Sequence, residues 1–417
     1  MTALSSRPVT SLYVHVPFCA QKCEYCAFYS EAASGELINR YVAALVRELE
    51  LIAPAAAPRT IFFGGGTPSL LTLRQWETIL RTMERAKLLG AAEWTVECNP
   101  ATVSLDKARL LRDFGVNRIS MGVQSLDEKL LDRLGRVHSR AMVFKSFDTL
   151  RAAGFDNINV DLMFAIPGQT LAVWRATLAE ALALGSEHLS SYEVIYEEDT
   201  PLFHQMQAGE FSVDEDLAAA MFEELLQRSA DAGFRQYEVA NFARETRAGS
   251  SAAPANDAPS VSSAVPVAAP GTAAGSLPAD APAFACQHNV NYWRGGEFHG
   301  VGPSATGYVA GERTKNWANT QLYCEQLEAG RRAIESREKL PPLGRAGETA
   351  AFGLRMNHGW PFRQFQTVTG FDLRTEWRAE MDELTACGFA ARSDERFQLT
   401  PLGLRYADYA AEKFLRP

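Results

Sequence analysis

The stretch "HVPFCAQKCEYCAFYS" (15–30) places Cys19, Cys23 and Cys26 in a C-x3-C-x2-C pattern. A disulfide framework uses an even number of cysteines, and a structural zinc site normally has four nitrogen or sulfur ligands. Three closely spaced thiolates instead favour a metal centre with one open coordination position. A [4Fe–4S] cluster fits this pattern, because three thiolates hold three irons and leave the fourth free. Zinc or a chance grouping is the weaker alternative.

The bulk composition narrows the class of protein. The 417 residues are enough for one large α/β domain and a smaller one, and 47% hydrophobic residues allow a substantial core. A formal net charge of −9 argues against a general nucleic-acid-binding surface. The odd count of 7 cysteines favours reduced thiols and a cytoplasmic location. Neither a signal peptide at the start nor an apolar run long enough for a membrane span is apparent, so we expect no integral membrane protein.

Short β-rich runs alternate with amphipathic stretches through the first half of the chain. The expected strands are 11–17, 59–65, 93–99, 118–124, 157–164 and 189–195. The expected helices include 37–53, 73–89 and 171–185. Thr72 and Gln75 have the spacing of a capping box. Several strands are nearly continuously apolar, as in parallel strands buried on both faces. Six such units predict an α/β fold with a partial parallel (β/α)6 barrel, and an open doubly wound sheet is the alternative.

The composition divides the chain into four segments. We expect residues 1–243 to form the barrel core. Residues 244–283 are mainly Ala, Pro, Ser and Gly, and we expect a disordered insert because they cannot bury enough apolar surface. Residues 284–330 would complete the core, and 331–417 would form a C-terminal domain.

The tail predicts a helix over 375–389, a hairpin over 390–400 and a last helix over 401–415. This order is typical of a small helical, winged-helix-like domain. We do not infer DNA binding from that shape, because the net charge is acidic.

Polar and special residues fall at the carboxyl ends of the expected strands, where a β/α barrel builds its active site. The cysteine loop follows the first strand and "GGGTP" (64–68) follows the second. Glu97, Gln124 and Asp161 belong to the next three strands. The carboxylates can accept hydrogen bonds from an amine or a ribose hydroxyl.

Two further features support a ligand site there, each with a structural alternative. Glycines let a small ligand approach the backbone, although a tight strand-to-helix turn would also use them. Arg136 can pair with a carboxylate in a forked geometry. Isolated polar residues such as Glu97, Gln124 and Asp161 also occur in solvated or buried structural roles.

The remaining cysteines and several histidines follow no site pattern. We expect ordinary packed thiols at Cys98, Cys324 and Cys387. We expect structural roles for His138, His188, His204 and His358.

The cysteine motif, preceded by "YVHVPFC" and followed by "GGGTP", resembles the radical S-adenosylmethionine (SAM) superfamily. The segments "LYVHVPFC", "GGGTPSLL", "ECNP", "NRISMGVQS", "LGRVH", "NVDLMFAIPGQ" and "HNVNYW" resemble the HemW heme chaperones more narrowly. These are relatives of the oxygen-independent coproporphyrinogen III oxidases. The resemblance covers nearly the whole chain outside 244–283.

The resemblance implies that Cys19, Cys23 and Cys26 bind a [4Fe–4S] cluster whose open iron takes the amino and carboxylate groups of SAM. The matching SAM-contact positions are Tyr13, Tyr25, Gly65, Gly66, Thr67, Glu97, Gln124, Arg136 and Asp161. In active members the reduced cluster passes one electron to SAM and a radical results, so the cofactors carry the hard chemistry.

One position separates chaperones from oxidases in this resemblance. The oxidases resemble C-x3-C-x2-C-x-C, and here Phe28 stands at the place of the fourth cysteine. Cys19 also lies close to the N-terminus, which leaves little room for the N-terminal extension of the oxidases. Both features favour the chaperone branch, which holds heme as cargo for an acceptor protein that the sequence does not name. An oxidase-like enzyme of porphyrin biosynthesis is the alternative, and a radical SAM enzyme with an unrelated substrate is a third.

The H-N-x-x-Y-W segment implies a heme site at His288, Asn289, Tyr292 and Trp293. An imidazole can be an axial iron ligand, and Tyr and Trp can lie against a flat macrocycle. Cys286 is an alternative soft ligand. The structural alternative is a hydrogen-bonded histidine with two core aromatics.

A nearby segment departs from the family pattern. Relatives tend to carry a histidine in a "GPGAHS"-like segment, and Thr306 of "GPSATG" stands at that place. If that histidine helps to ligate heme in relatives, ligation differs here, and His299 is the nearest histidine.

Overall fold

The computed structural model describes residues 8–32, 34–245, 278 and 281–416. Its centre is a nine-stranded sheet with the order β11-β1-β4-β5-β6-β7-β8-β10-β9. Six consecutive strands of this sheet run parallel. They are β1 (Val9–Val16), β4 (Ala56–Gly65), β5 (Glu93–Cys98), β6 (Arg118–Gln124), β7 (Ile158–Phe164) and β8 (His188–Glu193).

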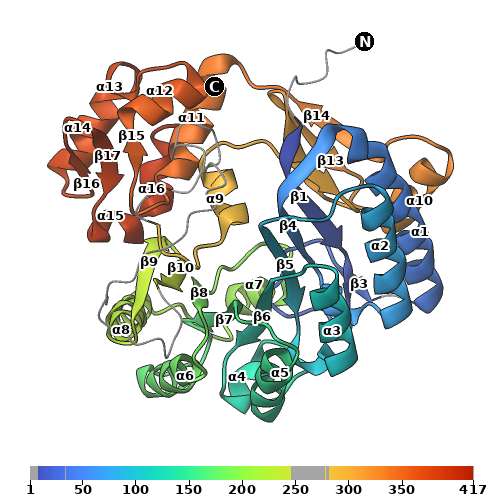
Figure 1. Cartoon of the computed structure of the whole chain (residues 1–417). Coiled ribbons are helices and arrows are strands. Elements are labelled where there is room, and N and C mark those ends of the chain that lie inside the picture. The colour runs from blue at the N-terminus through green and yellow to red at the C-terminus, as the bar shows by residue number, and fades with distance from the viewer. Residues whose placement is uncertain (1–7, 33, 246–277, 279–280, 417) are drawn as a thin grey trace, which may run out of the picture.

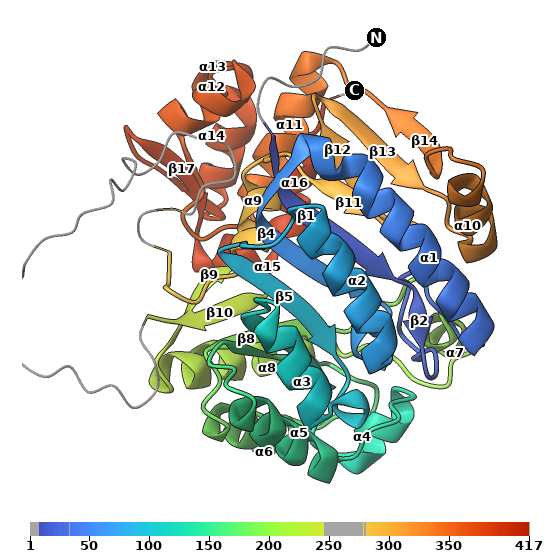
Figure 2. The same cartoon turned by 45° about the vertical axis from the view of Figure 1, so that its right-hand side comes forward.

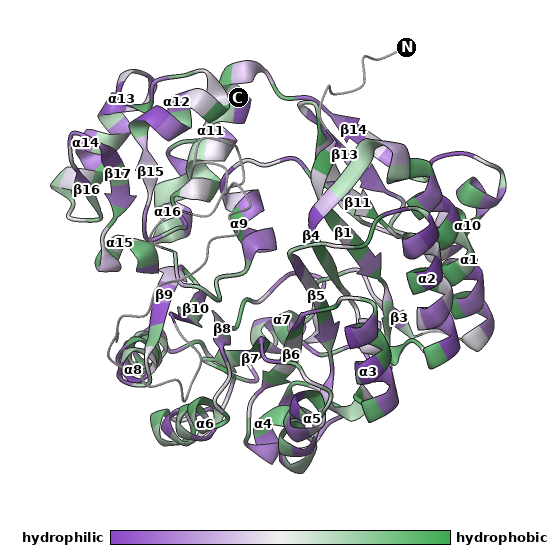
Figure 3. Ribbon diagram, in the orientation of Figure 1, coloured by the Kyte–Doolittle hydropathy of each residue, from purple (hydrophilic) through white to green (hydrophobic). Residues whose placement is uncertain are grey.

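Helices cover the outer face of this curved sheet (Figures 1 and 2). They are α1 (Gly35–Ile52), α2 (Leu73–Arg85), α3 (Leu105–Asp113), α5 (Arg140–Ala152), α6 (Leu171–Ala183) and α8 (Glu215–Asp231). In Figure 3 these helices mix hydrophilic and hydrophobic residues, as expected of helices that bury one face. A doubly wound sheet would reverse its strand order at a switch point, whereas these strands follow chain order. The partial barrel is therefore confirmed.

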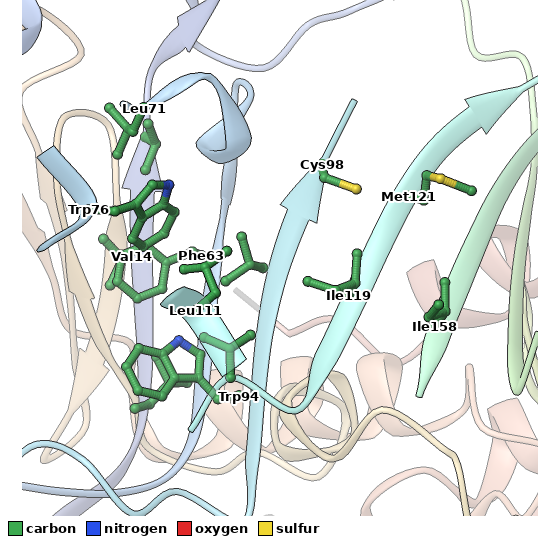
Figure 4. Packing of buried hydrophobic residues seen from close by; sticks show 14 of the residues in the cluster. Val14, Phe63, Leu71, Trp76, Trp94, Cys98, Leu111, Ile119, Met121 and Ile158 are labelled. Carbon is green, nitrogen blue, oxygen red and sulfur yellow. The ribbon is translucent and has the colours of Figure 1, made fainter. Parts of the chain in front are cut away.

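Each parallel strand has an apolar face and a polar face. Outward residues such as Val14, Phe63, Trp94 and Ile119 pack with helix residues, among them Trp76 (Figure 4). The inward residues are mostly polar: Ser11, His15, Thr60, Glu93, Thr95, Glu97, Arg118, Ser120, Asn159, Asp161, His188 and Ser190. The strands are buried on both faces, as expected, but the inward face is polar rather than apolar. The interior of the barrel is a polar chamber rather than a second apolar core.

The chain after the barrel strands adds three features beside them. Strand β10 (Asn241–Arg244) pairs antiparallel with β8 and with the edge strand β9 (Phe234–Glu238), and at the other edge β11 (His299–Val301) pairs in parallel with β1. Helix α9 (Gln287–Trp293) contacts β4. A separate antiparallel sheet contains β12 (Thr306–Val309), β13 (Glu312–Asn316) and β14 (Ile334–Glu338), with α10 (Thr320–Glu328) inserted before its last strand. Strand β14 lies in the expected C-terminal segment 331–417 but pairs with β13, which lies in the expected segment 284–330. The sheet therefore crosses the expected boundary.

The C-terminal residues have their own hydrophobic cluster, which includes Trp360, Phe365, Trp377 and Phe414. Strands β15 (Trp360–Pro361), β17 (Arg396–Leu399) and β16 (Ala390–Arg392) form a three-stranded antiparallel sheet. The helices are α11 (Pro342–Gly353), α12 (Phe362–Thr369), α13 (Leu373–Glu376), α14 (Arg378–Ala386), α15 (Pro401–Arg405) and α16 (Ala407–Glu412). The winged-helix-like arrangement and the hairpin are confirmed.

Several local expectations need correction. Helix α2 ends at Arg85 rather than near 89, because Lys87 adopts φ +59. The two predicted tail helices are each interrupted, at Trp377 and at Tyr406. The capping box of Thr72 and Gln75 is confirmed, with both hydrogen bonds present.

Most of the expected disordered insert, 246–277 and 279–280, lies outside the described residues. Within the described part of the chain, no helix combines the length and apolar character needed to cross a membrane.

Candidate functional site

The cysteine loop follows β1 at the carboxyl edge of the barrel. Strand β2 (Phe18–Cys19) pairs with β3 (Glu31–Ala32), which closes the loop at its base. The backbone N–H of Glu24 donates to Leu134 O at 3.1 Å, which ties the loop to the end of α4 (Glu128–Arg133). Cys19, Cys23 and Cys26 are all half-buried. The loop thus holds three thiols that remain partly accessible from outside.

Two side chains from the barrel reach the sulfur atoms. Thr67 Oγ1 donates to Cys19 Sγ at 3.6 Å, and Arg136 Nη1 donates to Cys23 Sγ at 3.3 Å. Burial raises the pKa of the Cys19 and Cys26 thiols, so metal binding there would release protons. The donor set fits a thiolate-bound cluster, because the Arg136 cation offsets the negative charge of the ligands. Among the described residues, no three His, Cys, Asp or Glu side chains lie close enough together to ligate one metal ion.

The glycine-rich turn packs directly on the cysteine segment. Gly65 has φ +106, and a Cβ there would lie 2.4 Å from the His15 ring. A Cβ at Gly66 would lie 2.7 Å from Phe18 O, and Gly66 N donates to Val16 O at 2.8 Å. The tight-turn interpretation of these glycines is therefore correct, whatever ligand also approaches them.

Two carboxyl groups lie inside the barrel at this edge. Glu97 Oε2 accepts from the backbone N–H of Gly65 at 3.1 Å. Asp161 accepts from Asn159 Nδ2 at 2.7 Å and from Ser120 Oγ at 3.1 Å. Burial, and then the Asp161 charge, raise the pKa of Glu97 to about 8, and burial raises the pKa of Asp161. Two such carboxyls suit a ligand that brings a positive charge, such as an amine.

Gln124 and Arg136 lie together over Gly122. A Cβ at Gly122 would lie 3.1 Å from Gln124 Nε2 and 3.2 Å from Arg136 Nη2. Arg136 Nη2 also donates to Gly122 O at 2.7 Å. Gln124 has φ +65 at a shift of register between β6 and β7, a backbone conformation that costs energy outside glycine and clusters at functional sites. Tyr25 lies near Arg136, and burial raises the pKa of its phenol.

Two residues that we did not predict face the same region. His15 Nε2 is 2.8 Å from Tyr29 O, and its Nδ1 is 3.0 Å from the hydroxyl of Tyr13. Tyr192 follows Ser190 on the inward face of β8. Alternation along β1 and β8 was the signal that would have found both.

His288 is enclosed within the barrel. It is 1% exposed, its Nδ1 is 2.9 Å from Thr60 Oγ1, and its Nε2 is 2.7 Å from the Tyr292 hydroxyl. Burial lowers the pKa of His288 to about 3, so the ring is neutral. Both ring nitrogens have internal partners, and ligation of iron would require the contact with Thr60 or the contact with Tyr292 to break.

The start of α9 is held by Glu93. Its carboxylate accepts from the backbone N–H groups of Gln287 at 2.8 Å and His288 at 2.9 Å, and from Cys286 Sγ at 3.5 Å. An acidic side chain at a helix N-terminus is electrostatically favourable. Cys286 is fully buried in this contact, while Asn289 is half-buried.

The other predicted structural residues are mostly buried. Cys98 and Cys324 are buried thiols, but Cys387 is exposed, so its predicted packing is wrong: it caps the end of α14 at the surface. Among the histidines, His138 and His188 are buried, His358 is half-buried and His204 is exposed.

A cavity of about 670 Å³ adjoins the cysteine loop. Its walls come from that loop, β1, α9, the β12–β14 sheet and α11. Its aromatic lining is Tyr13, Phe28, Tyr29, Tyr292, Trp293, Phe298, Tyr308 and Phe352. Thr306 also lines it. The volume lies within the range of small-molecule and cofactor sites.

The comparisons with known proteins agree with this geometry. Residues 13–181 match the radical SAM superfamily, and residues 340–406 match the HemN C-terminal domain. The Heme chaperone HemW of Escherichia coli is 31% identical, with 98% of each chain covered. The chain belongs to the HemW family. Heme chaperone HemW of Lactococcus lactis is 30% identical over 97% of each chain. The chain also has the fold of the E. coli coproporphyrinogen III oxidase HemN, whose structure matches with TM-score 0.77 at 19% identity, covering 99% of this chain and 92% of that one.

Proposed function

We propose that this protein is a heme chaperone that holds heme beside a [4Fe–4S] cluster and SAM, and passes heme to an acceptor protein in the cytoplasm. The observation that carries the proposal is the aromatic cavity of about 670 Å³, which the cysteine loop lines with Ala27, Phe28 and Tyr29. A porphyrin is flat and largely apolar, so aromatic walls suit it. The names of the HemW relatives support the same conclusion.

Cys19, Cys23 and Cys26 would hold the cluster, with Thr67 and Arg136 beside the sulfurs. SAM would lie along the inner edge of the barrel. Its contacts would come from Tyr13, Tyr25, Gly65, Gly66, Thr67, Glu97, Gln124, Arg136 and Asp161. Bound together, the cluster and SAM supply one-electron chemistry. The residues would orient SAM, and its positive charge would favour the ionised forms of Glu97 and Asp161, whose pKa values burial raises.

In the heme site, Tyr292 and Trp293 would contact the macrocycle, because both line the cavity. His288 would hold Tyr292 in place through the 2.7 Å contact between Nε2 and the hydroxyl. Asn289 belongs to the same helix but does not line the cavity. Phe28 presents a ring to the cavity where an oxidase has a thiol, which favours cargo binding over oxidation of a porphyrinogen.

The test is an anaerobic heme titration of the cluster-reconstituted protein, followed by Soret absorbance. We expect saturation near one heme per chain. A His288→Ala variant should bind heme severalfold more weakly with an unchanged spin state, whereas loss of a low-spin spectrum would show that His288 is an iron ligand. His204→Ala, at an exposed histidine, is the matched control.

An absence of saturable heme binding in the unaltered protein would contradict the chaperone function. The next assay would then be SAM-dependent turnover of coproporphyrinogen III under anaerobic conditions. Turnover there would move the protein to the oxidase-like alternative despite Phe28.

A further inference from the structure

We propose that the cavity recognises the carboxylate edge of its ligand through Lys315 and Arg345, while Phe28 packs on the flat apolar part. The ligand class is a planar macrocycle that carries two carboxylates, as heme does. The inference rests on the proposed heme function, and it specifies which cavity residues bind the carboxylate groups of the ligand.

The β12–β13 hairpin presents one face to the cavity. Thr306 pairs with Lys315 and Tyr308 pairs with Arg313 in the antiparallel register. Residues two apart on a strand share a face, and directly opposed residues share it too. All four residues therefore point to the same side, and all four line the cavity. Two cations, Arg313 and Lys315, stand next to each other in this wall.

The two cations differ in what neutralises them. Arg313 Nη1 pairs with Glu338 at 2.6 Å and its Nη2 pairs with Glu348 at 2.5 Å, so its charge is already matched by carboxylates. Lys315 is exposed and forms no ion pair with any residue that the structure describes. Its ammonium is the cation of this sheet that is available to a ligand.

Arg345 of α11 supplies a second cation from another element. Its guanidinium lies 3.8 Å from the centre of the Tyr308 ring, and its Nη2 is 3.4 Å from Gly295 O. Burial lowers the pKa of Arg345, while the nearby charges of Glu297 and Glu348 raise it. A ligand carboxylate would replace lost hydration with charge-assisted hydrogen bonds, for which a guanidinium is well shaped.

Phe28 supplies the apolar contact at the cysteine-loop end of the cavity. Its side chain is 69% exposed, the largest exposed fraction among the large hydrophobic residues described. It lines the same cavity as Tyr292 and Trp293. An exposed ring beside other aromatic walls gains by being covered, and a flat macrocycle is an occupant that can cover it.

The test compares two ligands: iron protoporphyrin IX, with two free carboxylates, and its dimethyl ester, with none. Both are titrated anaerobically into cluster-reconstituted, full-length protein. Lys315→Glu should weaken binding of the diacid about tenfold or more, because reversal of the charge adds repulsion, and should leave the diester unaffected. Phe28→Ala should weaken both ligands to a similar degree. Lys145→Glu, an exposed lysine on α5, is the control that should change neither.

The outcomes separate the inference from the function on which it rests. If the unaltered protein fails to bind the diacid, the heme function itself is contradicted. If it binds, but Lys315→Glu binds the diacid as tightly as Lys145→Glu does, the carboxylate site is overturned. Equal weakening of diacid and diester by Lys315→Glu would also overturn it, because the effect would then not involve the carboxylates. Circular dichroism melting curves establish that each variant is folded.

Discussion

Gly65 shows how tightly single residues are constrained at the glycine-rich turn. Its φ of +106 is unfavourable for other residues, and an added Cβ would lie 2.4 Å from the His15 ring. We expect Gly65→Ala to lower the free energy of unfolding by about 2–4 kcal/mol, measured by urea denaturation. Gly90 is the control, with φ +91 and open space around its Cβ, so Gly90→Ala should cost only about 1–2 kcal/mol. Equal losses would show that the contact with His15 is not what requires glycine.

Glu97 should make the stability of the cluster-free protein depend on pH. Its pKa is raised from 4.5 to about 8, first by burial and then by Asp161. The folded state therefore binds this proton more tightly than the unfolded state does. The resulting stability is fully present below the unfolded pKa of 4.5 and is lost as the pH rises through the folded value of about 8. As the pH rises from 4.5 to about 8, the Glu97→Gln variant should therefore lose less stability than the unaltered protein. The measurement is urea denaturation at a series of pH values.

The control for this prediction is Glu36→Gln, because Glu36 is exposed in the first turn of α1. It should leave the slope of stability against pH unchanged. Identical slopes for Glu97→Gln and the unaltered protein would show that another group is responsible.

For single residues, the sequence indicated which side chains lie at the strand ends, but not which residues they contact. Cys19, Gly65 and Glu97 follow from local motifs and from the rule that barrel sites gather at the carboxyl edge. The contact of His288 with Thr60 joins residues separated by 228 positions, and no local pattern encodes it. The predicted role of His288 as an iron ligand stays a prediction, with its two ring contacts as the obstacle.

Among the elements, helix α2 offers a measurable test of local sequence signals. The Thr72 side chain accepts from the backbone N–H of Gln75, and Gln75 Oε1 accepts from the backbone N–H of Thr72 at 2.9 Å. We expect Thr72→Ala to lower the free energy of unfolding by about 1 kcal/mol in urea denaturation. Thr367→Ala is the control, since its exposed hydroxyl only donates to Arg363 O within α12. If Thr72→Ala lowers the free energy of unfolding no more than Thr367→Ala does, the capping box makes no measurable contribution to stability.

The barrel strands and helices α1, α2 and α6 could be predicted, because apolar runs or amphipathic stretches mark them locally in the sequence. The β12–β14 sheet could not, because segments such as 312–316 and 334–338 are short and mostly polar. Their pairing depends on chain that is distant in sequence, with α10 between β13 and β14. The cavity could not be predicted from the sequence either, because its walls combine the cysteine loop with residues near 300 and 350.

For the whole molecule, the C-terminal domain is joined to the barrel through the end of α9 and through β9. Arg294 is fully buried, its Nη1 donates to Gly359 O at 2.7 Å, and its guanidinium lies 4.8 Å from the Trp360 ring. Asn357 N donates to Tyr237 O at 3.1 Å, which adds a backbone link to β9. The cavity takes walls from both sides of this junction, from α9 and from α11. Its shape should therefore depend on Arg294, although Arg294 does not itself line it.

Arg294→Met retains apolar volume but removes the hydrogen bond and the cation–π contact. We expect a loss of about 2–4 kcal/mol in stability, because Gly359 O is left without its buried donor. We also expect weaker heme binding in the anaerobic Soret titration, since α9 and α11 would no longer be held in register. Arg378→Met, at an exposed residue of α14, should change neither quantity. Reduced stability with unchanged heme affinity would mean that the cavity is shaped by the barrel side alone, and that the C-terminal domain serves another step, such as contact with the acceptor.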